Sequence, residues 1–186
     1  MEHAPDAGDV TVDADEGTAA SNSLTDEPML QALAAAAPAA EISTGNHAAG
    51  GRLDEATVPR EEYEACVAAA YDAGYTTFVD LCAVDYYSRD PRFEVVIQLI
   101  AMDQRRRLEI RVGVPGQDPV LASITGVFAG ANFYEREAWD LFGIDFTGHP
   151  DLTRILMPDE WDGHPLRKDA SVGSVPVQFK GAHKPA

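Results

Sequence analysis

Two histidines near the C-terminus are the residues best placed to do chemistry. His149 and His164 each stand in a Gly-His-Pro triplet, with carboxylates between positions 151 and 162. Imidazole and carboxylate groups bind zinc, which takes four protein ligands in structural sites and three plus a water in catalytic ones. The proline after each histidine favours extended backbone, so a helix cannot present both rings on one face. The spacing therefore disfavours a metal site, although a free-standing metal-dependent enzyme using these residues stays an alternative.

Other patterns that carry chemistry are weaker. No serine or cysteine stands in the strand-to-helix turn of a nucleophilic hydrolase. The glycine-containing stretches at 113–117 and 126–131 lack the spacing and the lysine of a phosphate loop. Cys66 and Cys82 lie in apolar surroundings without a nearby thiol, which predicts buried thiols in a reducing compartment. We expect no catalytic, cofactor-binding or metal-binding residue in this chain.

A charge-rich segment, NFYEREAWDLFG at 132–143, is open to two interpretations. Its charges could form a solvated helix face, in which an Arg136–Asp140 pair contributes only a few tenths of a kcal/mol. Alternatively, because they alternate with aromatic residues, some could be partly buried and paired, and so position a surface. On either interpretation, the apolar residues expected on the buried face of the helix are Phe133, Leu141, Ala138 and Phe142. Composition alone leaves both open.

The charge balance narrows the class of partner. The chain has 186 residues, 14 Lys+Arg against 31 Asp+Glu and a net charge of -17. Such a protein is no general binder of nucleic-acid backbone or anionic lipid, so its partner should be another protein. No stretch approaches the roughly 20 continuous apolar residues of a membrane span, and the acidic first residues are unlike a signal peptide. We expect a cytoplasmic protein that can sit on a membrane complex.

Residues 1–58 form an acidic, alanine-rich segment. They contain no aromatic residue and a single base, Arg52. Such a segment has too little apolar surface to offset the entropy lost on ordering. We therefore predict that 1–58 is disordered apart from a transient helix near 28–37.

Residues 59–142 have the pattern of an α+β domain, a mostly antiparallel sheet with helices packed on it. Proline at 59 and the acids after it favour a helix start. In the last strand, the alternating Leu108, Ile110 and Val112 predict a buried face. Short polar turns between strands predict antiparallel pairing, and a strand that is apolar on both faces should be interior. The expected elements are a helix over 60–73 and strands over 76–87, 93–102 (the interior one) and 106–115.

The end of the domain should be helical and its tail extended. We predict a short helix over 120–128 and another over 132–142, where Asn132 and Glu135 have the spacing of a capping box and Gly143 provides the stop. Residues 143–186 show no helix or strand of useful length, yet they keep apolar side chains that an isolated segment could not bury. The tail should lie along its own domain and across a partner.

One long stretch resembles a known family. Residues 131–169, ANFYEREAWDLFGIDFTGHPDLTRILMPDEWDGHPLRKD, are similar to the signature of the C subunit of bacterial NADH:quinone oxidoreductase, the 30 kDa subunit family of respiratory complex I. VDYYSRDPRFEVVIQLIAM and SITGVF are similar to the same family in order and spacing, so the resemblance covers about residues 60 to 180. It departs at Ala170-Ser171, where an aromatic residue and a proline are frequent, and at Ile97, where tyrosine is common.

The resemblance implies a function for the chain. Such a subunit is a non-catalytic scaffold in the peripheral arm, on the cytoplasmic face of the bacterial inner membrane, and supports electron transfer from NADH to quinone in a proton-translocating complex. It packs against the B and D subunits near the quinone-reducing end and meets the membrane only through the complex. It holds no cofactor itself, because FMN and the iron-sulfur clusters belong to partner subunits.

The resemblance also implies a docking role for particular residues. The positions that match the charged helix and the tail are Glu135, Arg136, Glu137, Asp140, His149, Pro150, Arg154, His164, Pro165, Arg167, Lys168 and Asp169. On this interpretation the two Gly-His-Pro triplets are architectural turns in a tail that clasps neighbouring subunits. The alternatives left open are the equivalent subunit of a membrane-bound hydrogenase or a reduced-deazaflavin:quinone oxidoreductase, and a soluble acidic adaptor unrelated to respiration.

Overall fold

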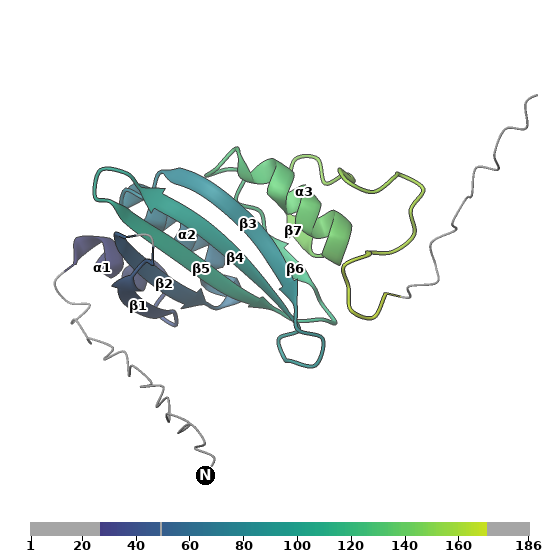
Figure 1. The fold of residues 1–186 in the computed structure, drawn as a ribbon, viewed down its shortest axis with the longest axis horizontal. Helices are drawn as coiled ribbons and strands as arrows, with labels where there is room; N and C mark the ends of the chain where they lie inside the picture. The colour runs from purple at the N-terminus through teal and green to yellow at the C-terminus, as the bar shows by residue number, and fades with distance from the viewer. Residues whose placement is uncertain (1–26, 49, 171–186) are drawn as a thin grey trace, which may run out of the picture.

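A five-stranded sheet forms the centre of the computed structural model, which describes residues 27–48 and 50–170 (Figure 1). Helix α2 lies behind the sheet, α1 contacts α2, and α3 lies beside strand β3. The elements in chain order are α1 (Pro28–Ala36), β1 (Glu41–Asn46), β2 (Arg52–Val58), the 3-10 turn η2 (Arg60–Glu62), α2 (Tyr63–Asp72), β3 (Thr77–Asp85), β4 (Phe93–Ala101), β5 (Arg106–Val114), β6 (Val120–Ala122), α3 (Ala131–Phe142) and β7 (Asp145–Thr147). The predicted α+β class is confirmed.

The sheet has the strand order β1-β2-β5-β4-β3. Strands β3, β4 and β5 pair antiparallel as predicted, and β4 is an interior strand. Strand β2 pairs antiparallel with β1 but parallel with β5. The sheet is therefore mostly antiparallel, with one parallel pairing that sequence did not predict.

The core lies between the inner face of the sheet and helices α1 and α2. On β5 the predicted alternation is confirmed, because Leu108, Ile110 and Val112 are completely buried. Ile110 stands opposite Ile97 on one side and Ala56 on the other, so apolar residues of three strands form one row. Helix α2 buries its own apolar side chains against this face, namely Tyr63, Cys66, Val67 and Ala70.

The ordered structure begins well before residue 59, which corrects the prediction of disorder over 1–58. Helix α1 buries Leu30 and Leu33, and β2 buries Ala56 and Val58. The charged group that β2 buries beside them, Asp54, is paired with Arg106. Domain and sheet thus include residues before Pro59, whereas 1–26 lie outside the described residues.

The second half of the chain contains two short strands, β6 and β7, that were not predicted. The predicted helix over 120–128 is wrong in its first part, since β6 occupies Val120–Ala122 and only a turn follows. Strand β7, of three residues, follows Gly143, where no strand of useful length was expected. The two strands pair parallel, with the buried Leu121 opposite the buried Phe146. This apolar pair gives both short strands a reason to form.

Helix α3 begins one residue earlier than predicted, and the capping box does not form. Gly130 is the N-cap, and no side chain caps the helix. Gly143 ends the helix as predicted, at φ 72°, and a Cβ there would lie 2.6 Å from the His164 ring. Phe133 is 60% exposed, which corrects its assignment to the buried face. Cys82, expected to be buried, is likewise exposed.

Among the helices of the described residues, none combines the length and apolarity needed to cross a membrane.

Candidate docking site

The carboxylate of Asp140, on α3, accepts hydrogen bonds from several groups of the tail. The Asp140 side chain is completely buried. Its Oδ1 accepts a hydrogen bond from Arg154 Nη1 at 2.5 Å. Its Oδ2 accepts from three consecutive backbone N–H groups, those of Ile155 at 3.1 Å, Leu156 at 2.8 Å and Met157 at 2.9 Å. Burial favours a higher pKa for Asp140, but these hydrogen bonds outweigh it and lower the pKa below its ordinary value.

Arg154 closes the segment that follows into a loop. Its Nη2 donates to the carbonyl oxygens of Trp161 at 2.8 Å and Gly163 at 3.1 Å. Its guanidinium carbon also lies 5.6 Å from the ring centroid of Trp139 on α3. Arg154 therefore ties residues 154–163, hereafter the tail loop, both to α3 and to themselves.

Arg136 braces the start of the tail loop from the preceding turn of α3. Its Nε donates to the Thr153 carbonyl oxygen, and its Nη2 donates to Thr153 Oγ1 and to the Arg154 carbonyl oxygen, each at 3.0 Å. Arg136 and Asp140 thus bind the tail, and the structure supports the second of the two interpretations of this helix, in which its charges position a surface.

Both histidines contact main-chain carbonyl groups of α3. His149 Nδ1 accepts from the Asp151 N–H at 3.0 Å, so its Nε2 carries the proton and donates to the Asn132 carbonyl oxygen at 3.2 Å. His164 Nδ1 donates to the Asp140 carbonyl oxygen at 2.9 Å. The two Gly-His-Pro turns therefore hold the tail at opposite ends of the helix. Within residues 27–48 and 50–170, no three His, Cys, Asp or Glu side chains are arranged to hold a metal ion.

The end of the described tail is attached to the sheet through Arg92. Its guanidinium donates to both oxygens of Asp85, at 2.9 and 2.7 Å, and to both oxygens of Asp169, at 2.9 Å each. The Lys168 N–H also donates to Asp85, at 2.9 Å. Hydrogen bonds from Arg92 lower the pKa of Asp85 well below its ordinary range. A depressed carboxyl pKa contributes stability above the unfolded aspartate pKa of about 3.9, and this contribution is lost as pH falls further.

The predicted docking residues differ in their solvent exposure. Glu137, Pro150, Lys168 and Asp169 are exposed. The partly buried ones are Arg136, His149, Arg154, His164, Pro165 and Arg167, the last of which lies over the Phe93 ring at 5.2 Å. Glu135 and Asp140 are completely buried in this chain, so a docking role for them would act through the residues that they hold in place.

Glu135 joins α3 to the segment that follows β6. Its Oε1 accepts from the Ile124 N–H and its Oε2 from Ser123 Oγ, both at 2.7 Å. Burial raises the pKa of Glu135 above its ordinary value, and these two hydrogen bonds offset only part of the rise. Glu135 thus fixes the start of α3 from inside the domain.

Glu135→Gln should leave the protein at least as stable as the parent at neutral pH. Glutamine keeps an acceptor for the Ile124 N–H and carries no charge, whereas Glu135→Ala leaves that buried N–H unpaired at a cost of roughly 1–3 kcal/mol. A raised carboxyl pKa means that the parent loses stability as pH rises through the unfolded glutamate pKa of about 4.3, so any advantage of glutamine should shrink toward pH 4. Denaturant midpoints of the three proteins at both pH values test this. Equal losses in the Gln and Ala variants would contradict it.

Large apolar side chains stay exposed on α3 and the tail. Because the N–H groups of Ile155 and Leu156 turn inward onto Asp140, their side chains remain outside, 38% and 59% exposed. Phe133 and, beyond the tail loop, Leu166 are 60% and 52% exposed. The sequence predicts that the apolar side chains of the tail lie along the domain and across a partner, but it does not show which of them stay exposed. It placed Phe133 on the buried face of the helix instead.

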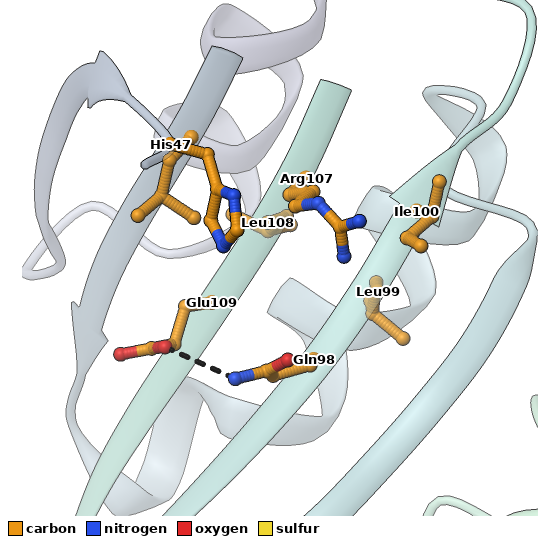
Figure 2. A pocket seen from close by; sticks show the side chains of 8 residues that line it. His47, Gln98, Leu99, Ile100, Arg107, Leu108 and Glu109 are labelled. Carbon is orange, nitrogen blue, oxygen red and sulfur yellow. Dashed lines mark hydrogen bonds between the residues drawn. The ribbon is translucent and has the colours of Figure 1, made fainter. Parts of the chain in front are cut away.

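A separate small pocket lies on the sheet, near the β1–β2 turn. Figure 2 shows Gln98 of β4 donating to Glu109 of β5, a bond of 3.4 Å. The pocket holds about 130 Å³, below the few hundred Å³ typical of cofactor sites. Its lining residues are His47, Leu53, Gln98, Leu99, Ile100, Arg107, Leu108 and Glu109.

Comparison with known proteins identifies what the chain is similar to. The family model described as "Respiratory-chain NADH dehydrogenase, 30 Kd subunit" matches residues 56–175. The C subunit of the NADH-quinone oxidoreductase of Roseiflexus sp. (strain RS-1) is 53% identical over 112 residues, which cover 57% of this chain and 64% of that protein. Its counterpart from Salinispora arenicola (strain CNS-205) is 51% identical over 111 residues, covering 57% and 45%. The match thus spans between about half and two thirds of these relatives.

Two solved structures share the fold. The trypsin-resistant fragment of Nqo5 superposes with a TM-score of 0.56 at 31% identity, covering 69% of this chain and 99% of the fragment. A chain of the membrane-bound sulfane sulfur reductase, an archaeal respiratory membrane complex, superposes with a TM-score of 0.66 at 20% identity, covering 80% and 86%. The second likeness concerns the fold alone.

Proposed function

Because this chain belongs to the 30 kDa subunit family of respiratory-chain NADH dehydrogenase, we propose that it is a non-catalytic scaffold subunit of a proton-translocating NADH:quinone oxidoreductase. It docks in the peripheral arm, at the cytoplasmic face of the membrane, against the B and D subunits, which form the quinone site. NADH and quinone are substrates of the whole complex, and FMN and the iron-sulfur clusters are held by other subunits. This chain supports electron transfer by keeping its neighbours in position.

The observation that carries the proposal is the fixed tail loop. Its backbone is anchored to the buried Asp140 while Ile155 and Leu156 stay outside. A loop held this firmly loses little entropy when it binds, and exposed apolar side chains on such a support are typical anchors of a protein interface. The domain therefore presents a preformed element for docking.

The charged residues act in this proposal mainly by positioning that element. Arg136 and Arg154 donate hydrogen bonds to carbonyl groups of the tail, and Arg154 also donates to the Asp140 carboxylate. His149 and His164 donate to carbonyl groups of α3. Exposed groups such as Glu137 and Lys168 are free to contact a partner directly.

The alternative is the equivalent subunit of a related membrane-bound hydrogenase or reduced-deazaflavin:quinone oxidoreductase. The same fold occurs in the membrane-bound sulfane sulfur reductase, so this scaffold fits a complex named for a different reaction. A mild-detergent pull-down from native membranes, through a tag on the N-terminus, distinguishes the two. We expect NADH-oxidising, cluster-bearing and membrane subunits by mass spectrometry. Hydrogenase subunits would favour the alternative, and recovery of the chain alone would contradict both.

Leu156→Asp should disrupt assembly without unfolding the chain. Leu156 is 59% exposed, so aspartate costs the isolated protein little, but a carboxylate buried in an interface should weaken binding at least about tenfold. Met102→Asp is the matched control, because Met102 is 67% exposed and lies at the β4–β5 turn, outside the tail. Co-purifying subunits and the melting temperature are measured for both. Equal assembly of the two variants would count against docking by the tail loop.

A further inference from the structure

The tail loop and its approach carry exposed charge of one sign only. Apart from His149, residues 148 to 163 contain one basic side chain, that of Arg154. It is only 13% exposed, and it pairs with Asp140 and donates hydrogen bonds to tail carbonyl groups. The exposed charged residues of this stretch are the acids Asp151, Asp159, Glu160 and Asp162. In the folded loop the Arg154 guanidinium is therefore mostly buried, whereas the four carboxylates are exposed.

These carboxylates flank the exposed apolar side chains. Asp151 precedes the loop, whereas Asp159 and Glu160 come directly after the turn that holds Ile155 and Leu156 outward. Within the part of the chain that the structure describes, no side-chain hydrogen bond or ion pair engages any of the four acids. A partner that covers Ile155 and Leu156 must therefore also desolvate the neighbouring carboxylates, which form no ion pair within the described part of this chain.

We propose that the partner surface facing the tail loop is an apolar socket rimmed by lysine or arginine side chains. The apolar residues enter the socket, and the four acids pair with the rim. A buried carboxylate without a cation disfavours binding, and a chain with net charge -17 would be repelled by an acidic partner. This inference rests on the proposed docking function and deepens it by naming the chemistry of the partner.

Charge reversal at the loop tests the proposal in the full-length chain. The double variant Asp159→Lys, Glu160→Lys is compared with Glu64→Lys, Asp103→Lys, which reverses two exposed acids on α2 and at the β4–β5 turn. Each tagged protein is immobilised and exposed to detergent-solubilised membranes of a strain that lacks its own copy of this protein, at low and at high salt. The captured subunits and their association rates are measured.

Opposed charges accelerate association at low salt, so the loop reversal should slow association at least about tenfold and should flatten its dependence on salt. The control reversal should leave both unchanged. Unchanged binding by the loop reversal, or tighter binding, would overturn the basic rim. If Leu156→Asp still abolished capture in that case, the docking function would stand. If Leu156→Asp also had no effect, the docking function itself would be wrong.

Discussion

Replacing Asp140 with alanine is expected to release the tail loop from α3 and to lower the free energy of unfolding by roughly 3–5 kcal/mol. The carboxylate is completely buried and accepts hydrogen bonds from three backbone N–H groups and from Arg154. Without it, a partly buried guanidinium loses its counter-charge and the N–H groups lose their acceptor. Removing one partner of a buried pair costs more than the net strength of the pair, because the remaining charge stays desolvated.

Hydrogen exchange and denaturant unfolding measure this effect in separate ways. Amides of Ile155, Leu156 and Met157 should lose protection in the Asp140 variant, whereas Glu137→Ala, an exposed change on the same helix, should stay within about 0.5 kcal/mol of the parent. The pKa of Asp140 is lowered in the folded protein, so its contribution is present above pH 4 and lost as pH falls further. Unchanged amide protection in the alanine variant would show that the tail loop is held by other contacts.

Asp54→Ala should have the other large effect, again roughly 3–5 kcal/mol. The buried Asp54 carboxylate accepts from Arg106 at 2.7 and 2.8 Å, from Tyr75 Oη at 2.6 Å and from Thr44 Oγ1 at 2.8 Å. Glu27 pairs with the same Arg106. One carboxylate thus connects β1, β2, β5 and the segment after α2, and its loss leaves Arg106 partly buried without that partner.

A double variant separates the buried charge from the packing. Asp54→Ala, Arg106→Leu removes both members of the strongest pair, so it should recover part of the stability that Asp54→Ala loses. Glu55→Ala is the control, since Glu55 is exposed on the other face of β2 and makes only a weak contact, 3.5 Å, with Ser43. Denaturant unfolding of the parent, the single variants Asp54→Ala and Arg106→Leu, and the double variant gives the coupling free energy. A double variant less stable than Asp54→Ala would contradict this assignment.

The parts of the fold that sequence predicted have strong local signals. Strand β5 was predictable because Leu108, Ile110 and Val112 alternate with charged residues, and a period of two places them on one face. After Pro59 the chain forms the 3-10 turn η2 and then helix α2, which begins at Tyr63 and ends before Gly74, so the stop signal holds and the α-helix starts later than predicted. In both cases the information lies within a dozen residues of the element.

The strands that sequence missed depend on distant residues. Strand β2 has few apolar residues, and its Asp54 would argue against burial were it not for Arg106, 52 residues further on. Strand β6 covers only three residues, too few to show a period. Single-sequence patterns do not reveal pairing across such distances, so the segment before Pro59 resembled a disordered one.

Sequence placed the candidate site on α3 and the tail, which the structure brings into contact, but it did not give the directions of the side chains there. Charge composition alone did not show that Asp140 points inward and Glu137 outward. In the structure, three tail N–H groups donate to the inward-pointing Asp140 carboxylate. The apolar anchors Ile155 and Leu156 emerge from the same geometry.

The parallel pairing of β2 with β5 constrains how the protein is made on the ribosome. The hairpin of β1 and β2 is synthesised first, but its neighbour in the sheet, β5, follows only after β3 and β4. Until β5 emerges, one edge of β2 has no partner and Val58 cannot be enclosed. Contacts between such distant segments form slowly, because a long loop must close first. The β1–β2 hairpin therefore stays incompletely paired while the chain between β2 and β5 is synthesised. Binding of a chaperone to the nascent chain would protect it best during this interval.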